Sequence, residues 1–213
     1  MMLRFLHGWA LDARMWDRLA ALLPEFKTAQ VDRDYFDRAP TPSPTSERAE
    51  LLVTHSFGTL LALRDPPPGC RGLVAINGFD RFTAGDDAPG IAPRIVERML
   101  ARFAEDPAAV VADFRKRCGD EEPFGDLALD RLRDDLAALR DWDCRAQAAE
   151  LALPILSLQG GADPILPSAM RDAVFAGAAL VERVTQPEGG HLLPLTDPAF
   201  CAAHIRRFAE RLA

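Results

Sequence analysis

Three side chains with complementary chemistry lie in short glycine-containing segments of this chain. Ser56 lies in the pentapeptide THSFG, Asp163 in GGADP and His191 in GGH. A serine hydroxyl becomes a good nucleophile when a base removes its proton, and an acid keeps that base in the right orientation. We therefore expect Ser56 to be the nucleophile, His191 the general base and Asp163 the acid that orients the imidazole.

Each of these residues also has a purely structural explanation. Serine is favoured as a helix N-cap, and an aspartate before a proline, such as Asp163 before Pro164, is common in turns. The segment THSFG departs from the G-x-S-x-G pattern because the β-branched Thr54 replaces the first glycine. Taken together, however, the three residues follow the chain order Ser, acid, His of one class of hydrolases, which favours catalysis.

An ester hydrolase must also stabilise the negative charge that develops on the attacked carbonyl oxygen. Two fixed backbone N–H groups usually do this. One donor is expected to be the amide of Phe57, directly after the nucleophile. The other is expected from the segment HGW near the start of the chain, where Gly8 allows close approach and Trp9 supplies its amide.

Short apolar segments alternate with helical patterns along most of the chain. Strands are predicted at residues 3–6, 28–31, 51–54, 72–76, 154–158 and 180–184. Helices are predicted in the stretch that ends at Pro24 and at residues 59–64, 168–175 and 198–212. This alternation predicts an α/β fold, a mostly parallel sheet flanked by helices. Ser56, Asp163 and His191 each follow a strand, so they should meet at its carboxyl edge.

The alternation is interrupted in the middle of the chain. Residues 82–144 contain helical patterns only, at 93–103, 107–118 and 127–139. We therefore expect a helical cap at 82–144, inserted into a core formed by 1–81 and 145–213. A surface loop is predicted at 32–46, where proline and acidic residues are frequent.

Composition excludes several classes of function. The chain has 213 residues and a formal net charge of −7, which argues against a nucleic-acid partner. Its four cysteines show neither metal-ligand spacing nor a disulfide framework, so we interpret them as reduced, mostly packing residues. A mechanism that uses Ser56, His191 and Asp163 is expected to need no metal and no organic cofactor. No apolar run is long enough for a membrane helix, and the start lacks a secretory signal, which predicts a cytoplasmic protein.

At this point the motifs resemble a known superfamily. The start HGW, the Ser56 turn, the segment GADPILP and the segment HLLP are similar to those of α/β-hydrolases over nearly the whole chain. Within that group, HGW, the tripeptide PGI at 89–91 and the segment 114–119 resemble the pimeloyl-[acyl-carrier protein] methyl ester esterases of biotin synthesis. The resemblance implies hydrolysis of a methyl ester on a pimeloyl chain held by acyl carrier protein. This chain is shorter than the larger members before Ser56.

The expected cap carries basic residues that would suit an acidic carrier protein. Arginines spaced four residues apart share one helix face, and a second basic cluster follows at 115–117. The alternative is a solvated face balanced by neighbouring acids. The residues expected to bind the substrate or the partner are Trp9, Arg94, Arg98, Arg115 and Arg117.

Two other functions stay open from the sequence. One is a general carboxylesterase or thioesterase that acts on small acyl substrates with the same residues. The other is a hydrolase-like ligand-binding protein that has lost turnover.

Overall fold

The computed structural model describes residues 1–37 and 50–212, which form a parallel sheet with helices on both faces. Its strands are β1 (Met2–Leu6), β2 (Lys27–Val31), β3 (Leu51–His55), β4 (Gly72–Ile76), β5 (Ile155–Gly160) and β6 (Val181–Gln186). They are ordered β2-β1-β3-β4-β5-β6, and every neighbouring pair is parallel. The predicted strands and the α/β class are confirmed.

The central strands are buried along their whole length because helices cover both of their faces. Every residue of β3, β4 and β5 is buried, whereas β6, at the edge of the sheet, alternates between partly buried and exposed positions over much of its length. The buried strands β3 and β5 therefore carry the loops of Ser56 and Asp163, whereas the His191 loop follows the edge strand β6.

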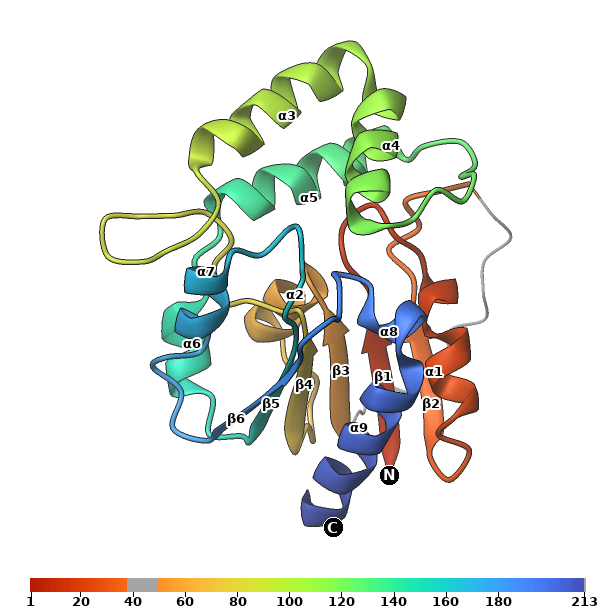
Figure 1. The fold of residues 1–213 in the computed structure, drawn as a ribbon, viewed down its shortest axis with the longest axis vertical. Helices are drawn as coiled ribbons and strands as arrows, with labels where there is room; N and C mark the ends of the chain where they lie inside the picture. Colours follow the sequence, from red (N-terminus) through yellow and green to blue (C-terminus); the bar gives the residue numbers. More distant parts are fainter. Residues whose placement is uncertain (38–49, 213) are drawn as a thin grey trace.

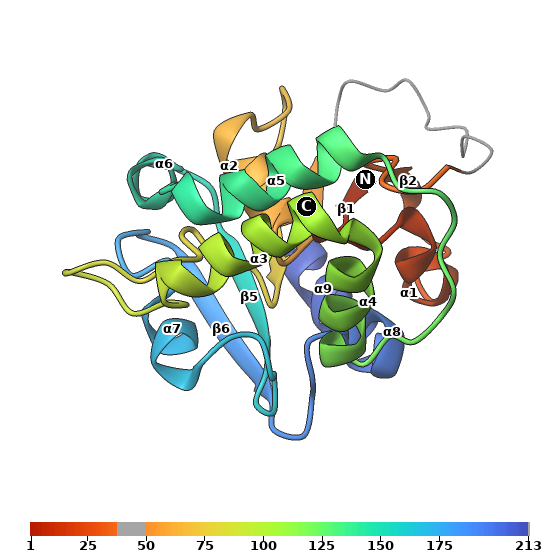
Figure 2. The same cartoon turned by 90° about the horizontal axis from the view of Figure 1, so that it is seen from above.

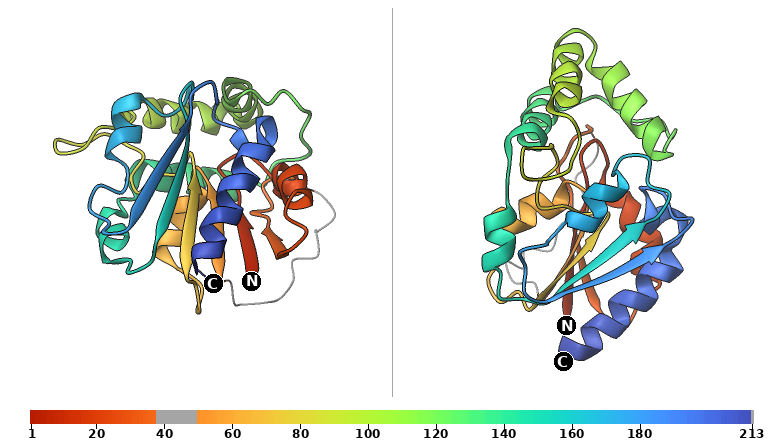
Figure 3. Two further views of the ribbon diagram at one scale, coloured as in Figure 1. Left: turned by 60° about the horizontal axis from the view of Figure 1, so that its bottom comes forward. Right: turned by 60° about the vertical axis from the view of Figure 1, so that its left-hand side comes forward.

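The covering helices occupy both faces. They are α1 (Asp17–Ala21), α2 (Gly58–Arg64), α6 (Arg145–Glu150), α7 (Ser168–Ala173), α8 (Leu193–Thr196) and α9 (Pro198–Leu212). Helices α1 and α9 pack together on one face, and α2 and α6 pack together on the other (Figure 3). A short 3-10 helix, η1 (Ala13–Trp16), precedes α1, and the side chain of Asp12 caps it by accepting from the Arg14 amide.

Three further helices lie above the carboxyl ends of the strands (Figure 1). These are α3 (Pro93–Glu105), α4 (Pro107–Cys118) and α5 (Leu129–Asp141), in the interval predicted as the cap. Helix α5 packs along α3, and α4 turns away from them (Figure 2). The division of the chain into core and cap stays a prediction, and "cap" below means α3 to α5.

A buried ionic cluster ties the cap to the segment after β2. The carboxylate of Asp135 on α5 accepts from the guanidinium of Arg33 at 2.6 Å and from the hydroxyl of Tyr35 at 2.6 Å. Burial, the largest influence, and the nearby Asp135 carboxylate raise the pKa of Tyr35 well above its usual value, so its hydroxyl stays a donor. The position of α5 over the sheet is thus held by directional bonds as well as by apolar packing.

Part of the loop predicted at 32–46 lies outside the described residues, from residue 38 onward. Of the described part, Phe36 forms an antiparallel bridge with Leu127 of the cap. None of the helices in the described ranges combines the length and apolar character needed to cross a membrane.

Candidate active site

Ser56 occupies the sharp turn between β3 and α2. Its φ is +50°, a conformation that costs energy for a residue other than glycine. Gly58 makes the turn possible, because a Cβ there would lie 2.5 Å from the carbonyl oxygen of Leu6 and 2.7 Å from that of His7. Strain at a serine on a strand-to-helix turn is characteristic of a nucleophile held by the surrounding fold.

Thr54, the departure from the glycine pattern, is accommodated by hydrogen bonds. Its hydroxyl donates to the carbonyl of Val74 at 3.2 Å and lies 2.8 Å from the hydroxyl of Thr59 on α2. The buried hydroxyl is therefore satisfied, and it links β3 both to β4 and to the first turn of α2.

Asp163 and His191 are joined across the loops that follow β5 and β6. The imidazole Nδ1 of His191 donates to Oδ2 of Asp163 at 2.8 Å. The other carboxylate oxygen accepts from the amides of Ile165 at 2.7 Å and Leu166 at 3.1 Å. Burial, the largest influence, raises the pKa of Asp163, but the bonds from His191 and the two amides outweigh it and lower the pKa overall. Asp163 is thus an ionised acceptor.

The second imidazole nitrogen is left free for proton transfer. Nε2 of His191 is buried and has no hydrogen-bond partner among the described residues. The bond from Ser56 that the chemistry requires is therefore not formed in this structure. Because Nδ1 carries the proton given to Asp163, Nε2 has the lone pair needed to accept one from Ser56.

The two backbone amides predicted to hold the oxyanion, those of Trp9 and Phe57, are both free of an acceptor among the described residues. A Cβ on Gly8 would lie 3.0 Å from that of Ser56, so the loop passes close to the nucleophile. Nδ1 of His7 donates to the Gly8 carbonyl at 2.8 Å. Since that carbonyl and the Trp9 N–H belong to one planar peptide unit, His7 also fixes the direction of the N–H.

The sequence analysis missed Asn77, which connects the acid loop and the histidine loop. Asn77 directly follows β4, is fully buried and has a φ of +45°. Its amide nitrogen donates to the carbonyls of Gly190 at 3.0 Å and His191 at 2.7 Å, and its amide oxygen accepts from the Gly160 amide at 2.7 Å. The only indication of this role in the sequence is that an asparagine, a residue type that tolerates left-handed backbone, stands at the end of a strand.

A second residue also holds the backbone of His191. Nε2 of His55 donates to the His191 carbonyl at 2.9 Å, and the two imidazole rings meet edge to face with centroids 4.8 Å apart. Burial, followed by the neighbouring His191, lowers the pKa of His55 to about 3. His55 is therefore neutral at neutral pH and acts as a donor to backbone, not as a second base.

We predict that Asn77→Asp lowers kcat about 10- to 100-fold with little change in KM, as is typical when a residue that orients an active group loses its bonds. A carboxylate there cannot donate to the two carbonyls. It also adds negative charge beside His191, which favours the imidazolium and should move the acidic limb of the pH–rate profile to higher pH.

Asn77→Gly is the matched control, because glycine accepts the positive φ and removes the same bonds without adding charge. It should lower kcat and leave the acidic limb in place. A wild-type kcat in both variants, or the same pH profile in both, would contradict a positioning role for Asn77.

The structure corrects the expectation that the Trp9 side chain binds substrate. This side chain is 1% exposed, and its indole N–H donates to the carbonyl of Leu132 on α5 at 2.8 Å. Its ring packs edge to face on Phe114 of α4, with centroids 5.0 Å apart. The ring therefore anchors the cap to the core, and the backbone amide of Trp9 stays the predicted oxyanion donor.

The structure also corrects the expectation for Arg115. Its side chain is 3% exposed and pairs with Asp120 at 2.7 Å. Its guanidinium lies over the rings of Phe36 and Phe124, at 5.4 and 5.5 Å from their centroids. A side chain enclosed in this way cannot meet a partner protein, because the helix face that carries it packs against the core.

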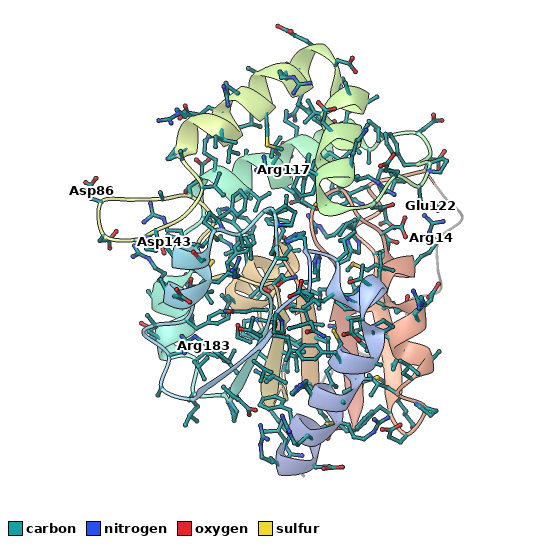
Figure 4. All side chains as sticks on the ribbon, viewed as in Figure 1. Arg14, Asp86, Arg117, Glu122, Asp143 and Arg183 are labelled. Carbon is teal, nitrogen blue, oxygen red and sulfur yellow. The ribbon has the colours of Figure 1, made fainter. Side chains whose placement is uncertain are left out.

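The other three arginines do lie at the surface. Arg94 is exposed at the start of α3, and Arg98 and Arg117 are exposed beside a pocket between α3 and α4. In Figure 4, Arg117 lies where α4 faces the loops of the core, and its guanidinium donates to the carbonyl of Pro164 at 3.3 Å. Their roles toward a partner stay predictions.

The part of the chain described by the structure contains no cluster of three or more His, Cys, Asp or Glu side chains placed to hold a metal ion.

Comparison with known proteins identifies the family and the fold of this chain. A model described as "Alpha/beta hydrolase family" matches residues 5–204. The chain is 26% identical to the pimeloyl-[acyl-carrier protein] methyl ester esterase of Pectobacterium atrosepticum, over 96% of this chain and 92% of that protein. It is 28% identical to the esterase of the same name from Sodalis glossinidius, over 85% and 87%. An esterase structure from Exiguobacterium antarcticum superimposes with a TM-score of 0.81 at 18% identity, over 99% and 92% of the two chains.

Proposed function

Since the chain belongs to the α/β-hydrolase family, we propose that it is a serine hydrolase that cleaves a carboxylic ester, with Ser56, His191 and Asp163 as its catalytic residues. The observation that supports this most is the buried pair of Asp163 and His191, which leaves Nε2 unpaired. An imidazole with one nitrogen held by a carboxylate and the other free is arranged to act as a general base.

In the proposed reaction, Nε2 of His191 takes the proton of the Ser56 hydroxyl while Oγ attacks the ester carbonyl. The carbonyl oxygen gains negative charge and is held by the amides of Trp9 and Phe57. The imidazolium then gives its proton to the leaving alcohol as the C–O bond breaks. A water molecule, deprotonated by His191, then attacks the acyl carbonyl, and the bond to Oγ of Ser56 breaks as Oγ takes that proton back from the imidazolium, which releases the acid. Asp163 holds Nδ1 and stabilises the imidazolium throughout.

A fluorophosphonate probe tests this proposal against the alternative of an inactive ligand-binding protein. An activated serine is phosphonylated quickly, whereas an ordinary serine reacts very slowly. We expect one probe to be attached per chain, at Ser56, with loss of esterase activity in parallel. Labelling at another residue, or none, would favour the binding protein.

The finer proposal is that the ester is pimeloyl-carrier methyl ester, as the names of the relatives suggest, and that the reaction takes place in the cytoplasm. The support is the identity of 26% over nearly the whole chain. The exposed Arg94, Arg98 and Arg117 are the residues proposed to meet an acidic carrier. Rescue of a biotin auxotroph that lacks its own esterase tests the pathway directly.

We predict that reversing Arg94, Arg98 and Arg117 to Glu lowers kcat/KM for the carrier-linked ester about 10- to 100-fold, far more than for a small uncharged ester. The reason is that complementary charge speeds association, and that this steering is screened by salt. Wild-type kcat/KM on the carrier-linked ester should therefore fall as salt rises. The measurement is initial rates on both esters at several salt concentrations.

Lys27→Glu, at the start of β2, is the charge control: it makes the same change in charge as each single reversal, at the opposite end of the strands, and should leave kcat/KM for the carrier-linked ester unchanged. If the triple variant slows both esters equally, the cap has been damaged. If it slows neither, the general carboxylesterase or thioesterase becomes the better proposal.

A further inference from the structure

The residue whose amide is proposed to hold the oxyanion is bonded to the cap through its side chain. The indole N–H of Trp9 donates to the carbonyl of Leu132 on α5 at 2.8 Å, and the Trp9 side chain is 1% exposed. The ring and the amide of one residue share a Cα atom, so a movement of the buried ring also moves the amide. The position of α5 over the core therefore affects the direction of the Trp9 N–H.

The backbone beside this amide is in a conformation that its neighbours have to impose. Ala10, directly after Trp9, has a φ of +56°, which is unfavourable for a residue with a side chain. Backbone of this kind persists only where the surrounding structure holds it. The carbonyl of Ala10 accepts from the guanidinium of Arg115 on α4 at 3.4 Å, so this contact also comes from the cap.

A second chain of bonds connects α5 to the other side of the same peptide unit. The carboxylate of Asp135 on α5 accepts from the guanidinium of Arg33 at 2.6 Å. The backbone N–H of Arg33 donates to Nε2 of His7 at 2.9 Å, and Nδ1 of His7 donates to the Gly8 carbonyl at 2.8 Å. That carbonyl and the Trp9 N–H belong to one planar unit. Helix α5 is thus connected to this unit from both sides.

We propose that α5 positions the oxyanion donor, with Asp135 and the indole of Trp9 as positioning residues for the Trp9 amide. This inference rests on the proposed ester hydrolysis at Ser56. Both groups act through the loop after β1, which they hold in the conformation that directs the amide at the developing negative charge. Closure of the cap and completion of the oxyanion hole are then one event, and a donor displaced by about 1 Å loses much of its effect.

The first test is Trp9→Phe, which keeps an aromatic ring and removes the bond to Leu132. We expect kcat with p-nitrophenyl acetate to fall about 10- to 100-fold while KM stays within about twofold of wild type, because the lost interaction is made in the transition state. A trifluoromethyl ketone forms a hemiketal oxyanion with an activated serine, so its affinity should fall by the same factor as kcat. The affinity of the matching methyl ketone should not change.

Asp135→Asn tests whether the effect comes from α5. An amide presents a single oxygen to Arg33, so we expect kcat to fall about tenfold with the same difference between the two ketones. If this variant does not fold, Tyr35→Phe gives a milder test. It removes one bond to Asp135 and keeps the ring that packs on His7, with centroids 5.6 Å apart, and kcat should fall several-fold.

Thr83→Val is the matched control on the same helix. Thr83 is 3% exposed, and its hydroxyl donates to the carbonyl of Arg140 at the other end of α5 at 2.9 Å. Valine has the same shape and removes a bond to α5 that does not involve the loop after β1. Its kcat and its affinities for both ketones should therefore equal those of wild type.

Wild-type kcat and ketone affinities in Trp9→Phe would overturn positioning by α5 and leave ester hydrolysis at Ser56 intact. So would an equal loss in Thr83→Val and Asp135→Asn, or a loss of affinity for both ketones by one factor, since either would mean general damage to the cap. A wild-type protein that neither hydrolyses the ester nor prefers the trifluoromethyl ketone would overturn the proposed function itself.

Discussion

Ser56→Ala is expected to lower ester hydrolysis by about 10⁴-fold or more while the protein remains folded. The change removes the attacking oxygen, and no other described side chain in the turn can replace it. The residue is 5% exposed, so only a small buried atom is lost. The measurement is kcat with p-nitrophenyl acetate, combined with thermal unfolding of the same preparation.

Ser56→Gly separates the effect of losing the hydroxyl from the effect of the unfavourable backbone conformation. Alanine keeps the unfavourable φ of +50°, whereas glycine adopts it without a steric penalty. We expect Ser56→Gly to be as inactive as Ser56→Ala and to unfold at the same temperature as wild type or higher. Substantial hydrolysis by either purified variant would show that Ser56 is not the nucleophile.

Asp163→Asn should lower kcat on the order of 10⁴-fold, the loss seen when a catalytic histidine is held by the wrong group. The amide oxygen can still accept from the amides of Ile165 and Leu166, which directs the NH₂ group toward Nδ1 of His191. Nδ1 must then accept, so the ring proton moves to Nε2. In that tautomer Nε2 cannot take a proton from Ser56.

Asp80→Asn is the matched control, since Asp80 is a buried acid after the neighbouring strand. Its carboxylate accepts from the Phe175 amide at 2.9 Å, so its loss should affect stability more than kcat. Asp86, another acid after that strand, lies at the tip of an exposed loop (Figure 4). Near wild-type kcat in Asp163→Asn would mean that another acid orients His191.

The order of strands and helices could be predicted because short sequence patterns specify each of them. The buried strands contain short apolar runs, and paired glycines occur at 160–161, where β5 ends, and at 189–190, in the loop after β6. In a parallel sheet, residues that follow different strands meet at one edge. Asp163 and His191 could therefore be paired before any coordinates were known.

Whether an individual cap residue is exposed or buried could not be predicted from local patterns. Arg98 and Arg115 both belong to basic patterns on predicted helices, yet Arg98 is exposed and Arg115 is enclosed. The difference depends on Phe36, far from Arg115 in the sequence, and on how α4 sits against the core. Helical periodicity defines which residues share a face, but it does not say which face packs.

By itself, the sequence determined the sheet, the order of the candidate serine, aspartate and histidine along the chain, and the glycine that lets the turn at Ser56 pass close to β1. These features depend on residue type and short spacing. Only the tertiary structure decided that Asn77 braces the loops of Asp163 and His191 and that the Trp9 ring anchors the cap. Those contacts join residues more than 80 positions apart, such as Asn77 and Gly160, 83 apart, or Trp9 and Leu132, 123 apart. A hydrogen bond acts through space over about 3 Å, so chain separation leaves no local pattern that encodes it.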